Sequence, residues 1–281
     1  MTDKVDKAVL LAAGLGRRMR QREESPGAGT IVLDSGQASA ADAGWKGLVP
    51  VPRPFLDYVL SGLADAGIGE VCLVIGPGGS NPIRERYAAL PLRRLAVRFA
   101  VQESPRGTAD ATLAAEEFAA KGDFLLANAD NYYPVVAYRA LRALSEPGLP
   151  VFERDTLAQR GNVPRERVAR YATLRVGPDG CLARIDEKPG PEALAALETK
   201  PGPVLVSMNL WRFSPGIFEA CRRVPVSARG ERELPQAVQV GIDALGLRFR
   251  AAPCAEGVLD LSTRADVASV ERALAGIAVS L

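Results

Sequence analysis

Histidine is absent from this sequence of 281 residues. Its absence excludes catalytic triads of the Ser-His-Asp type, metal sites with imidazole ligands, and acid–base catalysis by imidazole. An enzyme made from this chain therefore has to work with carboxylates, lysine, arginine, backbone amides or a hard cation.

Cysteine is scarce, and the four cysteines form no pattern. They stand at positions 72, 181, 221 and 254, and no two of them have the spacing of metal ligands. Four scattered thiols in a chain of this length do not make a disulfide framework either. We therefore expect buried, reduced thiols in a cytoplasmic protein.

Long apolar runs and strong net charge are also missing. No run approaches the roughly 18 residues of a membrane helix, and the N-terminus lacks the apolar segment of a signal peptide. The formal net charge is +2, and 47% of the residues are hydrophobic. We expect an ordinary globular protein without a nucleic-acid or membrane partner. A homo-oligomer is compatible with the sequence.

Apolar runs and helical periodicity alternate along the first half of the chain. Short apolar runs predict buried strands at residues 7–13, 70–75 and 123–127, and alternation of apolar and polar residues predicts a strand at 95–101. Helical spacing predicts helices at 54–66 and 109–120. This order indicates the α/β class, with a Rossmann-like, mostly parallel mixed sheet and helices on both faces.

The second half is more mixed and predicts a smaller lobe. The pattern indicates a hairpin at 171–176 and 181–185, strands at 204–213 and 247–252, helices at 216–223 and 234–244, and a closing helix at 263–277. Ser262 or Thr263 is the expected N-cap of that closing helix. Without a clear linker or repeat, residues 1–281 form one domain. Residues 1–135 and 136–281 would be the two halves of this domain.

Residues 21–45 break this rhythm because they are rich in Gly, Ala, Ser, Glu and Asp. We interpret them as an inserted loop. A loop of this length in a compact domain is usually functional or mobile. A lid over the site and a disordered insertion both remain open.

The first chemical motif follows the first predicted strand. Its residues, expected to lie against phosphate groups, are Leu11, Ala12, Ala13, Gly14 and Gly16. Glycines let backbone amides approach phosphates closely, and Arg18 behind them can neutralise phosphate oxygens. The dinucleotide-binding pattern does not fit, because Met19 stands where its third glycine belongs. The Walker pattern fails because it lacks Gly-Lys-Ser/Thr.

A second motif, Lys46-Gly-Leu-Val-Pro-Val, precedes the helix at 54–66. At this point the sequence resembles the sugar-phosphate nucleotidyltransferases, the pyrophosphorylases that make nucleotide sugars. Glucose-1-phosphate thymidylyltransferases and uridylyltransferases belong to that family. It opens with Leu-Ala-x-Gly-x-Gly-x-Arg-Met/Leu and continues with Lys-x-Leu-Leu-Pro-Val, a helix and a strand. The resemblance extends through nearly the whole chain, with a longer distance between the glycines and the lysine.

Four further segments follow in the family's order. In 102–111 the resemblance assigns Gln102 and the backbone near Gly107 to the nucleobase and includes Thr108 in nucleotide binding. Residues 1–135 would accordingly be the nucleotide-binding half and 136–281 the sugar-phosphate-binding half. The segment 123–131 places Asp130 at a strand end as a Mg²⁺ ligand, and Asp260 in 257–266 is the second metal ligand. The family's Glu-Lys-Pro stretch assigns Glu187 and Lys188 to the sugar phosphate, and Asn209 stands where a glycine backbone normally meets the sugar. Any one of these could be an ordinary loop residue, but six in the right order are difficult to explain by coincidence.

The resemblance implies a Mg²⁺-dependent enzyme that joins a nucleoside triphosphate to a sugar 1-phosphate and releases pyrophosphate. Arg18 would stabilise the pyrophosphate, Lys46 the α-phosphate or the incoming phosphate, and Lys188 the sugar phosphate. Gln102 favours uracil or thymine and hence UTP or dTTP. The neighbouring Gly-Thr-Ala-Asp-Ala also resembles the adenylyl and guanylyl branches.

Three departures from the family pattern bear on the substrate. Ala129 and Ser262 replace glycines, and Asn209 adds a side chain, so we expect an altered pocket that takes an unusual sugar or cyclitol phosphate. One alternative is a catalytically inactive, regulatory protein of this fold that binds nucleotide sugars. Another is a glycosyltransferase of related topology, and an NAD-dependent dehydrogenase is a more distant one.

Overall fold

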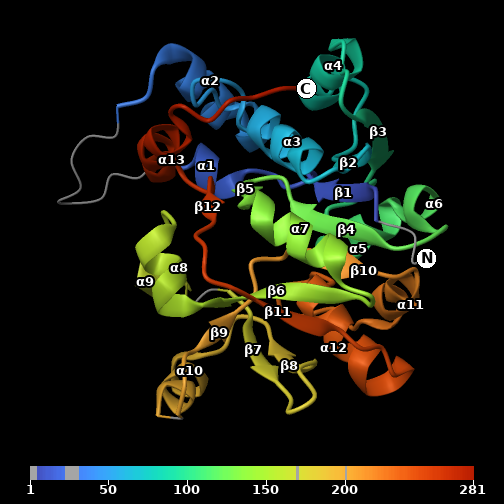
Figure 1. Ribbon diagram of the computed structural model, residues 1–281. Coiled ribbons are helices and arrows are strands. Elements are labelled where there is room, and N and C mark those ends of the chain that lie inside the picture. The colour runs from blue at the N-terminus through green and yellow to red at the C-terminus, as the bar shows by residue number, and fades with distance from the viewer. Residues whose placement is uncertain (1–4, 23–31, 169–170, 200) are drawn as a thin grey trace.

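The computed structural model describes residues 5–22, 32–168, 171–199 and 201–281 (Figure 1). Its main sheet has the strand order β3-β2-β1-β4-β10-β6-β9-β7-β8, with β11 beside β6. The strands are β1 (Lys7–Leu11), β2 (Glu70–Ile75), β3 (Ala96–Val101), β4 (Phe124–Asn128), β6 (Gly148–Glu153), β7 (Thr173–Val176), β8 (Leu182–Asp186), β9 (Leu205–Val206), β10 (Trp211–Phe213) and β11 (Arg250–Cys254). A separate small sheet pairs β5 (Asn131–Tyr132) with β12 (Leu259–Asp260).

Helices connect these strands and cover the sheet. They are α1 (Arg17–Arg20), α2 (Ser35–Ala43), α3 (Phe55–Asp65), α4 (Pro82–Ala89), α5 (Thr108–Ala114), α6 (Glu116–Ala119), α7 (Val135–Ala143), α8 (Arg154–Arg160), α9 (Arg165–Val168), α10 (Pro191–Glu198), α11 (Gly216–Arg223), α12 (Leu234–Leu245) and α13 (Val267–Leu274). Single turns of 3₁₀ helix lie at Lys46–Leu48 and Arg264–Asp266.

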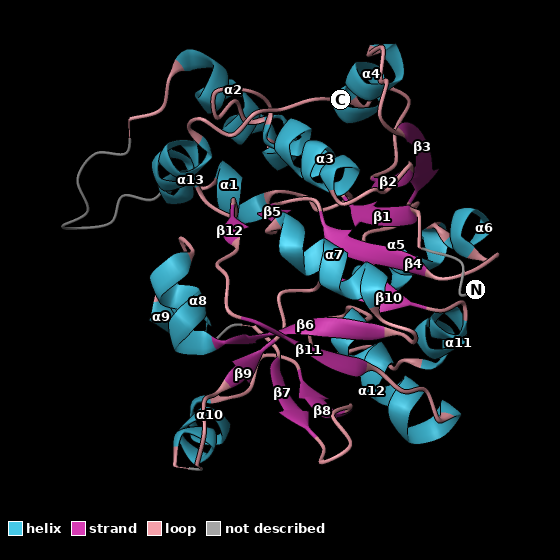
Figure 2. Ribbon diagram, in the orientation of Figure 1, coloured by secondary structure: helices cyan, strands magenta, loops and turns pink. Residues whose placement is uncertain are grey.

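The strands β1, β2, β3 and β4 are parallel; β1, β2 and β4 are buried on both faces, whereas β3 is a partly exposed edge strand. β1 lies between β2 and β4, and β2 pairs with β3, all in parallel. In β1, Leu10 joins the hydrophobic core formed with α3 and α7, whereas Val9 joins the core formed with α5, α11 and α12. A strand buried on both faces needs an uninterrupted apolar run, which is why these strands were readable from sequence. The three-layer arrangement in Figure 2 confirms the predicted fold class.

The second half of the sheet is largely antiparallel, and here one prediction is wrong. Residues 204–213 do not form a long strand but two short ones, β9 and β10. Between them Asn209 adopts a left-handed backbone conformation with φ of 55°, which no strand residue can adopt. β9 pairs with β6 and β7, whereas β10 pairs with β4 and β6.

The prediction of an inserted loop at 21–45 is also wrong in part, because α2 occupies residues 35–43. Asp34 caps this helix by accepting a hydrogen bond from the Gln37 amide at 2.7 Å, and the Gln37 side chain bonds back to Asp34. Gly44 ends it in a left-handed conformation. These are standard helix-end signals, which the polar composition concealed. Residues 23–31 lie outside the described part of the chain.

Other boundaries differ by a few residues. The helix predicted at 109–120 is divided at Ala115 into α5 and α6. The closing helix is shorter than predicted, since α13 ends at Leu274, and Thr263 forms the capping box of the preceding 3₁₀ turn.

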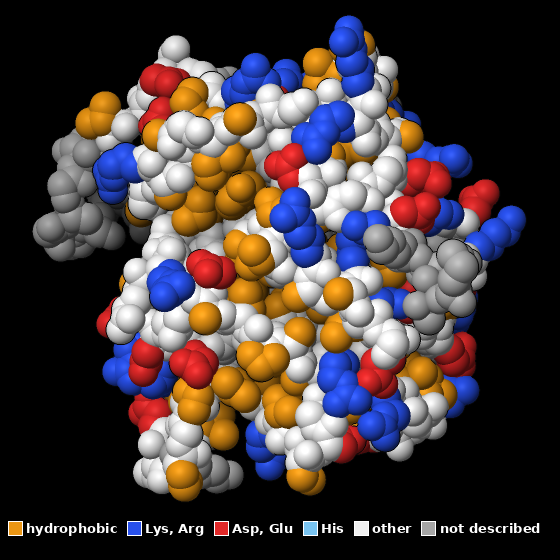
Figure 3. Space-filling model, in the orientation of Figure 1, with side chains coloured by type: hydrophobic (Ala, Val, Ile, Leu, Met, Phe, Trp, Pro, Cys, Tyr) orange, Lys and Arg blue, Asp and Glu red, His pale blue; other side chains and the backbone are white. Residues whose placement is uncertain are grey.

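The described surface carries charges of both signs, interspersed on the face seen in Figure 3. None of the described helices combines the length and apolarity that crossing a bilayer requires.

Candidate active site

The glycine turn after β1 borders a cavity at the carboxyl end of the parallel strands. Gly16 has a φ of 61°, and a Cβ there would lie 2.3 Å from the carbonyl oxygen of Gly44. Gly14 has no heavy atom within 4 Å of such a Cβ. Gly16 is therefore required by the contact with Gly44, whereas Gly14 leaves open space beside the backbone, into which a ligand can approach.

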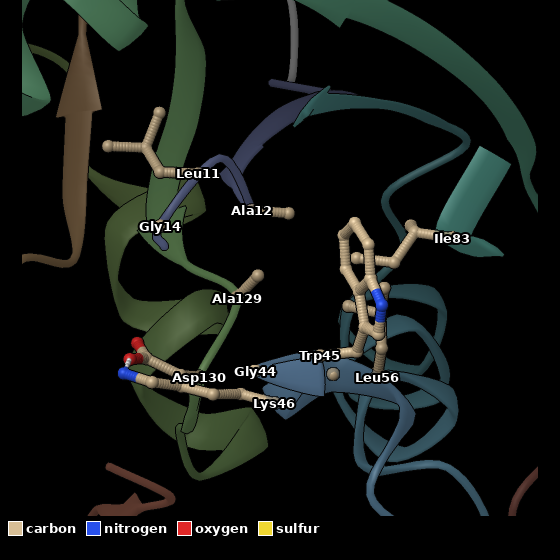
Figure 4. Close-up of a pocket in the computed structure, with 11 residues that line it drawn as sticks. Leu11, Ala12, Gly14, Gly44, Trp45, Lys46, Leu56, Ile83, Ala129 and Asp130 are labelled. Carbon is tan, nitrogen blue, oxygen red and sulfur yellow. Dashed lines mark hydrogen bonds and ion pairs between the residues drawn. The ribbon is translucent and has the colours of Figure 1, made fainter. Parts of the chain in front are cut away.

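The nucleotide-site candidates surround this cavity of about 380 Å³. Those that line it are Leu11, Ala13, Gly14, Gly16, Arg18, Lys46, Gln102, Gly107, Thr108 and Asp130. Ala12 is the exception. It faces a smaller cavity of about 50 Å³ beside Trp45 and Ile83, as Figure 4 shows.

Lys46 and Asp130 are joined by an ion pair between these two cavities. Lys46 comes from the 3₁₀ turn and Asp130 follows β4, and their Nζ and Oδ2 atoms are 2.8 Å apart (Figure 4). Both side chains are largely buried, with 16% and 26% exposure. A partly buried pair is screened less by solvent than a surface pair, so each group holds the other in place.

Asp260 reaches the same place from the end of the chain. Its strand β12 pairs antiparallel with β5, which sets Asp260 opposite Asn131, and the Leu261 amide donates to the Asp130 carbonyl oxygen at 2.9 Å. Burial raises the pKa of Asp260, and the nearby charge of Asp130 raises it further. The two carboxylates predicted as metal ligands are therefore brought together.

The Asp260 carboxylate is only partly satisfied by the protein. The Tyr171 hydroxyl donates to Oδ2, while Oδ1 is buried and has no hydrogen-bond partner among the described residues. An acceptor buried without a donor is costly unless something else binds it. A divalent cation would satisfy it, since Mg²⁺ commonly uses one or two carboxylates and completes its shell with water and phosphate oxygens. Within the described residues no group of three acidic or thiol side chains forms a metal cluster, so this fit depends on two.

A second cavity of about 420 Å³ opens from the first. Arg18, Thr108, Asn128 and Glu231 line both. The sugar-phosphate candidates Glu187, Lys188 and Asn209 all line the second cavity. Lys188 and Asn209 are the non-glycine residues with positive φ in the described chain, at 47° and 55°. Such conformations are uncommon and are found most often at functional sites.

Glu187 is the most perturbed carboxyl in this cavity. Burial raises its pKa from 4.5 to about 7, and repulsion from Glu233 adds to the effect. Arg229, which pairs with Glu233 and lies 3.5 Å from Glu187, opposes it. Part of the Glu187 population is therefore protonated at neutral pH.

Backbone contacts join the two cavities at their common wall. The Arg232 amide donates to Arg106 at 2.7 Å, and its carbonyl oxygen accepts from Ala109 at 2.9 Å. The Leu234 amide donates to the Thr108 hydroxyl at 2.8 Å. Gly107, with φ of 108°, sits so close that a Cβ would lie 2.4 Å from the Arg232 carbonyl oxygen.

Sequence reasoning missed three residues that line or support the second cavity: Tyr171, Arg167 and Arg229. Tyr171 and Arg167 line it, and Arg229 pairs with two glutamates there. Tyr171, Arg167 and Arg229 contact Asp260, Asp266 and Glu187, which lie far away in the sequence. Only the Arg229–Glu233 pair is local, with the spacing of four residues that is common among charged residues.

Comparison with known proteins shows the family and the fold of this chain. Residues 45–249 match the family described as Nucleotidyl transferase. The chain is 27% identical over 244 residues to a glucose-1-phosphate thymidylyltransferase of Streptomyces griseus, covering 85% of this chain and 58% of that protein. It is 25% identical over 237 residues to a UTP–glucose-1-phosphate uridylyltransferase of Haloferax volcanii, covering 83% and 82%. The chain spans little more than half the length of some relatives, 56% and 58% in two cases.

Among solved structures, the fold is similar to UDP-glucose pyrophosphorylase complexed with UDP-glucose. The TM-score is 0.71 at 17% identity, over 96% of this chain and 98% of that one.

Proposed function

Because the chain belongs to the nucleotidyl transferase family, we propose that it joins a nucleoside triphosphate to a sugar 1-phosphate, giving a nucleotide sugar and pyrophosphate. The observation that carries the proposal is the junction of two contiguous cavities. Arg18 lines both cavities, Lys46 and Asp130 line the first, and the buried Asp260 is joined through its strand to the segment of Asp130. Two phosphorylated substrates placed end to end would meet there.

The reaction needs alignment and charge neutralisation more than proton transfer. A phosphate oxygen of the sugar 1-phosphate forms a bond to the α-phosphorus, and the bond from that phosphorus to the bridging oxygen breaks. Pyrophosphate leaves with the electron pair. Because the nucleophile is already an anion, no general base is required, which is compatible with a chain that lacks histidine.

We assign the basic residues to the charges that this step moves. Arg18 faces the pyrophosphate, Lys46 the α-phosphate or the incoming phosphate, and Lys188 the phosphate of the sugar. The 2.8 Å pair with Asp130 holds the Lys46 ammonium in position before substrate arrives. Preorganised charge of this kind is effective because it needs no reorganisation during the reaction.

Asp130 and Asp260 are the residues that would hold Mg²⁺. When bound there, the cation would supply neutralisation of phosphate charge and a common anchor for both substrates. Tyr171 keeps Asp260 oriented through its hydrogen bond to Oδ2, which leaves Oδ1 available.

For the substrates, we propose UTP or dTTP and a sugar or cyclitol phosphate that fits around Asn209. The relatives' names include both a thymidylyltransferase and a uridylyltransferase. Asn209 lines the sugar cavity with a side chain able to donate and accept hydrogen bonds. If ordinary glucose 1-phosphate were the best substrate in a panel, the altered-pocket part of the proposal would be wrong.

The test is pyrophosphate release with Mg²⁺ across a grid of nucleoside triphosphates and sugar or cyclitol phosphates. Asp130→Asn should lower turnover by orders of magnitude while the protein stays folded. Asp243→Asn, an exposed change on α12, is the matched control and should keep full activity. If no combination releases pyrophosphate but a triphosphate binds tightly, the second substrate is a phosphate outside the grid. If no combination releases pyrophosphate and no triphosphate binds, a regulatory protein is favoured. If Asp130→Asn is as active as Asp243→Asn, Asp130 does not belong to the site.

A further inference from the structure

Gln102 follows the last residue of β3 and lines the nucleotide cavity. Its side chain is almost completely buried, with 5% exposure. The Nε2 atom donates to the Gly107 carbonyl oxygen at 3.0 Å and to Asp110 Oδ2 at 2.9 Å. Both hydrogens of this amide are thus used inside the protein.

These contacts determine which way the amide faces. A backbone carbonyl and a carboxylate are acceptors only, so the nitrogen of Gln102 has to face them. Its Oε1 accepts no hydrogen bond from the described residues, and it is not among the buried atoms left without a partner. Oε1 is therefore the atom that Gln102 presents to the cavity.

Of the two acceptors of the Gln102 amide, Asp110 is the one that binds no other described donor. The Gly107 carbonyl oxygen also accepts the Ala111 amide, at 3.1 Å, as the first bond of α5. Asp110 accepts no other hydrogen bond among the described contacts. It projects from the first turn of α5, where a negative charge is favourable.

We propose that Asp110 is a positioning residue that makes Gln102 a pure hydrogen-bond acceptor, so that among the pyrimidines the site selects uracil or thymine, which carry a protonated ring nitrogen, over cytosine. The inference rests on the proposed function, since it assumes that this cavity takes the base of a triphosphate. It adds a residue to the site and a physical reason for the choice of base.

The selection follows from the chemistry of the bases. Uracil and thymine carry an N–H at ring position 3, which donates to Oε1. The same position of cytosine is an acceptor, and two lone pairs would face each other. In a buried site such a mismatch leaves both groups unsatisfied and is strongly rejected. An amide free to turn over would present Nε2 instead and would accept cytosine.

The experiment measures dissociation constants of UTP, dTTP, CTP and GTP by calorimetry with the whole chain, together with pyrophosphate release. Wild type should bind UTP or dTTP at least tenfold more tightly than CTP. Asp110→Asn should lower that ratio about tenfold, because Asn can donate to Gln102 Oε1 and let the amide turn. Asp110→Ala, which leaves Gly107 as the remaining acceptor, should also lower it. Glu103→Gln removes the same charge at an exposed neighbouring position and should leave the ratio unchanged.

The outcomes separate this inference from the proposed function. If both Asp110 variants unfold at the same temperature as wild type and keep its ratio of affinities for UTP or dTTP over CTP, Asp110 has no part in base selection. Equal binding of CTP by wild type, or tightest binding of GTP, would overturn the assignment of the base. If wild type binds no triphosphate, the proposed function itself fails. A change in base preference, rather than in overall activity, is the readout that a merely structural role would not produce.

Discussion

Replacing Glu187 by Gln should stabilise the protein at alkaline pH and have little effect in acid. In the folded protein burial and Glu233 raise the pKa of Glu187 from 4.5 to about 7, and the side chain is 13% exposed. The folded state therefore binds more protons than the unfolded state between these values, and the free energy of unfolding falls as pH rises. Gln has the same shape but cannot ionise.

The size of the effect follows from that pKa. At 1.36 kcal/mol per pKa unit, the unfavourable ionisation amounts to about 3 kcal/mol, fully present above about pH 8 and below about 1 kcal/mol at pH 5. Glu187→Gln should gain this difference, while its affinity for the sugar phosphate falls because a carboxylate acceptor is lost. Such a gain in stability with a loss in function is common at binding sites.

Urea unfolding of both proteins at pH 5, 6, 7 and 8.5 measures this difference. Glu192→Gln, an exposed change on α10, controls for the loss of one negative charge and should stay within about 0.5 kcal/mol of wild type. A stability difference between Glu187→Gln and wild type that does not grow with pH would refute the reasoning. A wild type more stable than Glu187→Gln at pH 8.5 would show that the Arg229 contact outweighs burial.

Three other perturbations test separate parts of the site. Gly107→Ala places a Cβ 2.4 Å from the Arg232 carbonyl oxygen at a φ of 108°. The variant should bind the triphosphate at least tenfold more weakly in calorimetry, because the added Cβ pushes the Gly107 and Arg232 segments apart. Unchanged binding would show that these two segments can separate without affecting the site. Tyr171→Phe removes the hydroxyl that donates to Asp260 and should lower kcat about tenfold or more, with KM for the triphosphate nearly constant; an effect on KM alone would contradict its role. Chelation by EDTA should stop pyrophosphate release reversibly without changing the far-ultraviolet circular dichroism, and activity in EDTA would exclude the metal.

Much of the fold was predictable because it depends on local pattern. β1, β2 and β4 are short apolar runs buried on both faces, and α3 and α11 have clear helical periodicity. These patterns are visible in any window of the sequence. The pattern failed at α2, whose capping residues surround an Ala- and Ser-rich helix. It also failed at 204–213, where a turn at Asn209 interrupts an apolar run.

The site was predictable as a set of residues but not as an arrangement. The absence of histidine, the glycine turn, and the order of basic and acidic residues at strand ends and in loops are readable without a structure. Folding was needed to bring Asp260 to Asp130, to pair Lys46 with Asp130, and to orient the Gln102 amide through Asp110. The raised pKa of Glu187 also depends on the folded structure, because burial and the nearby Glu233 cause it. The physical reason is range: periodicity and capping act over a few residues, whereas desolvation and charge pairing depend on segments that meet only when the sheet has formed.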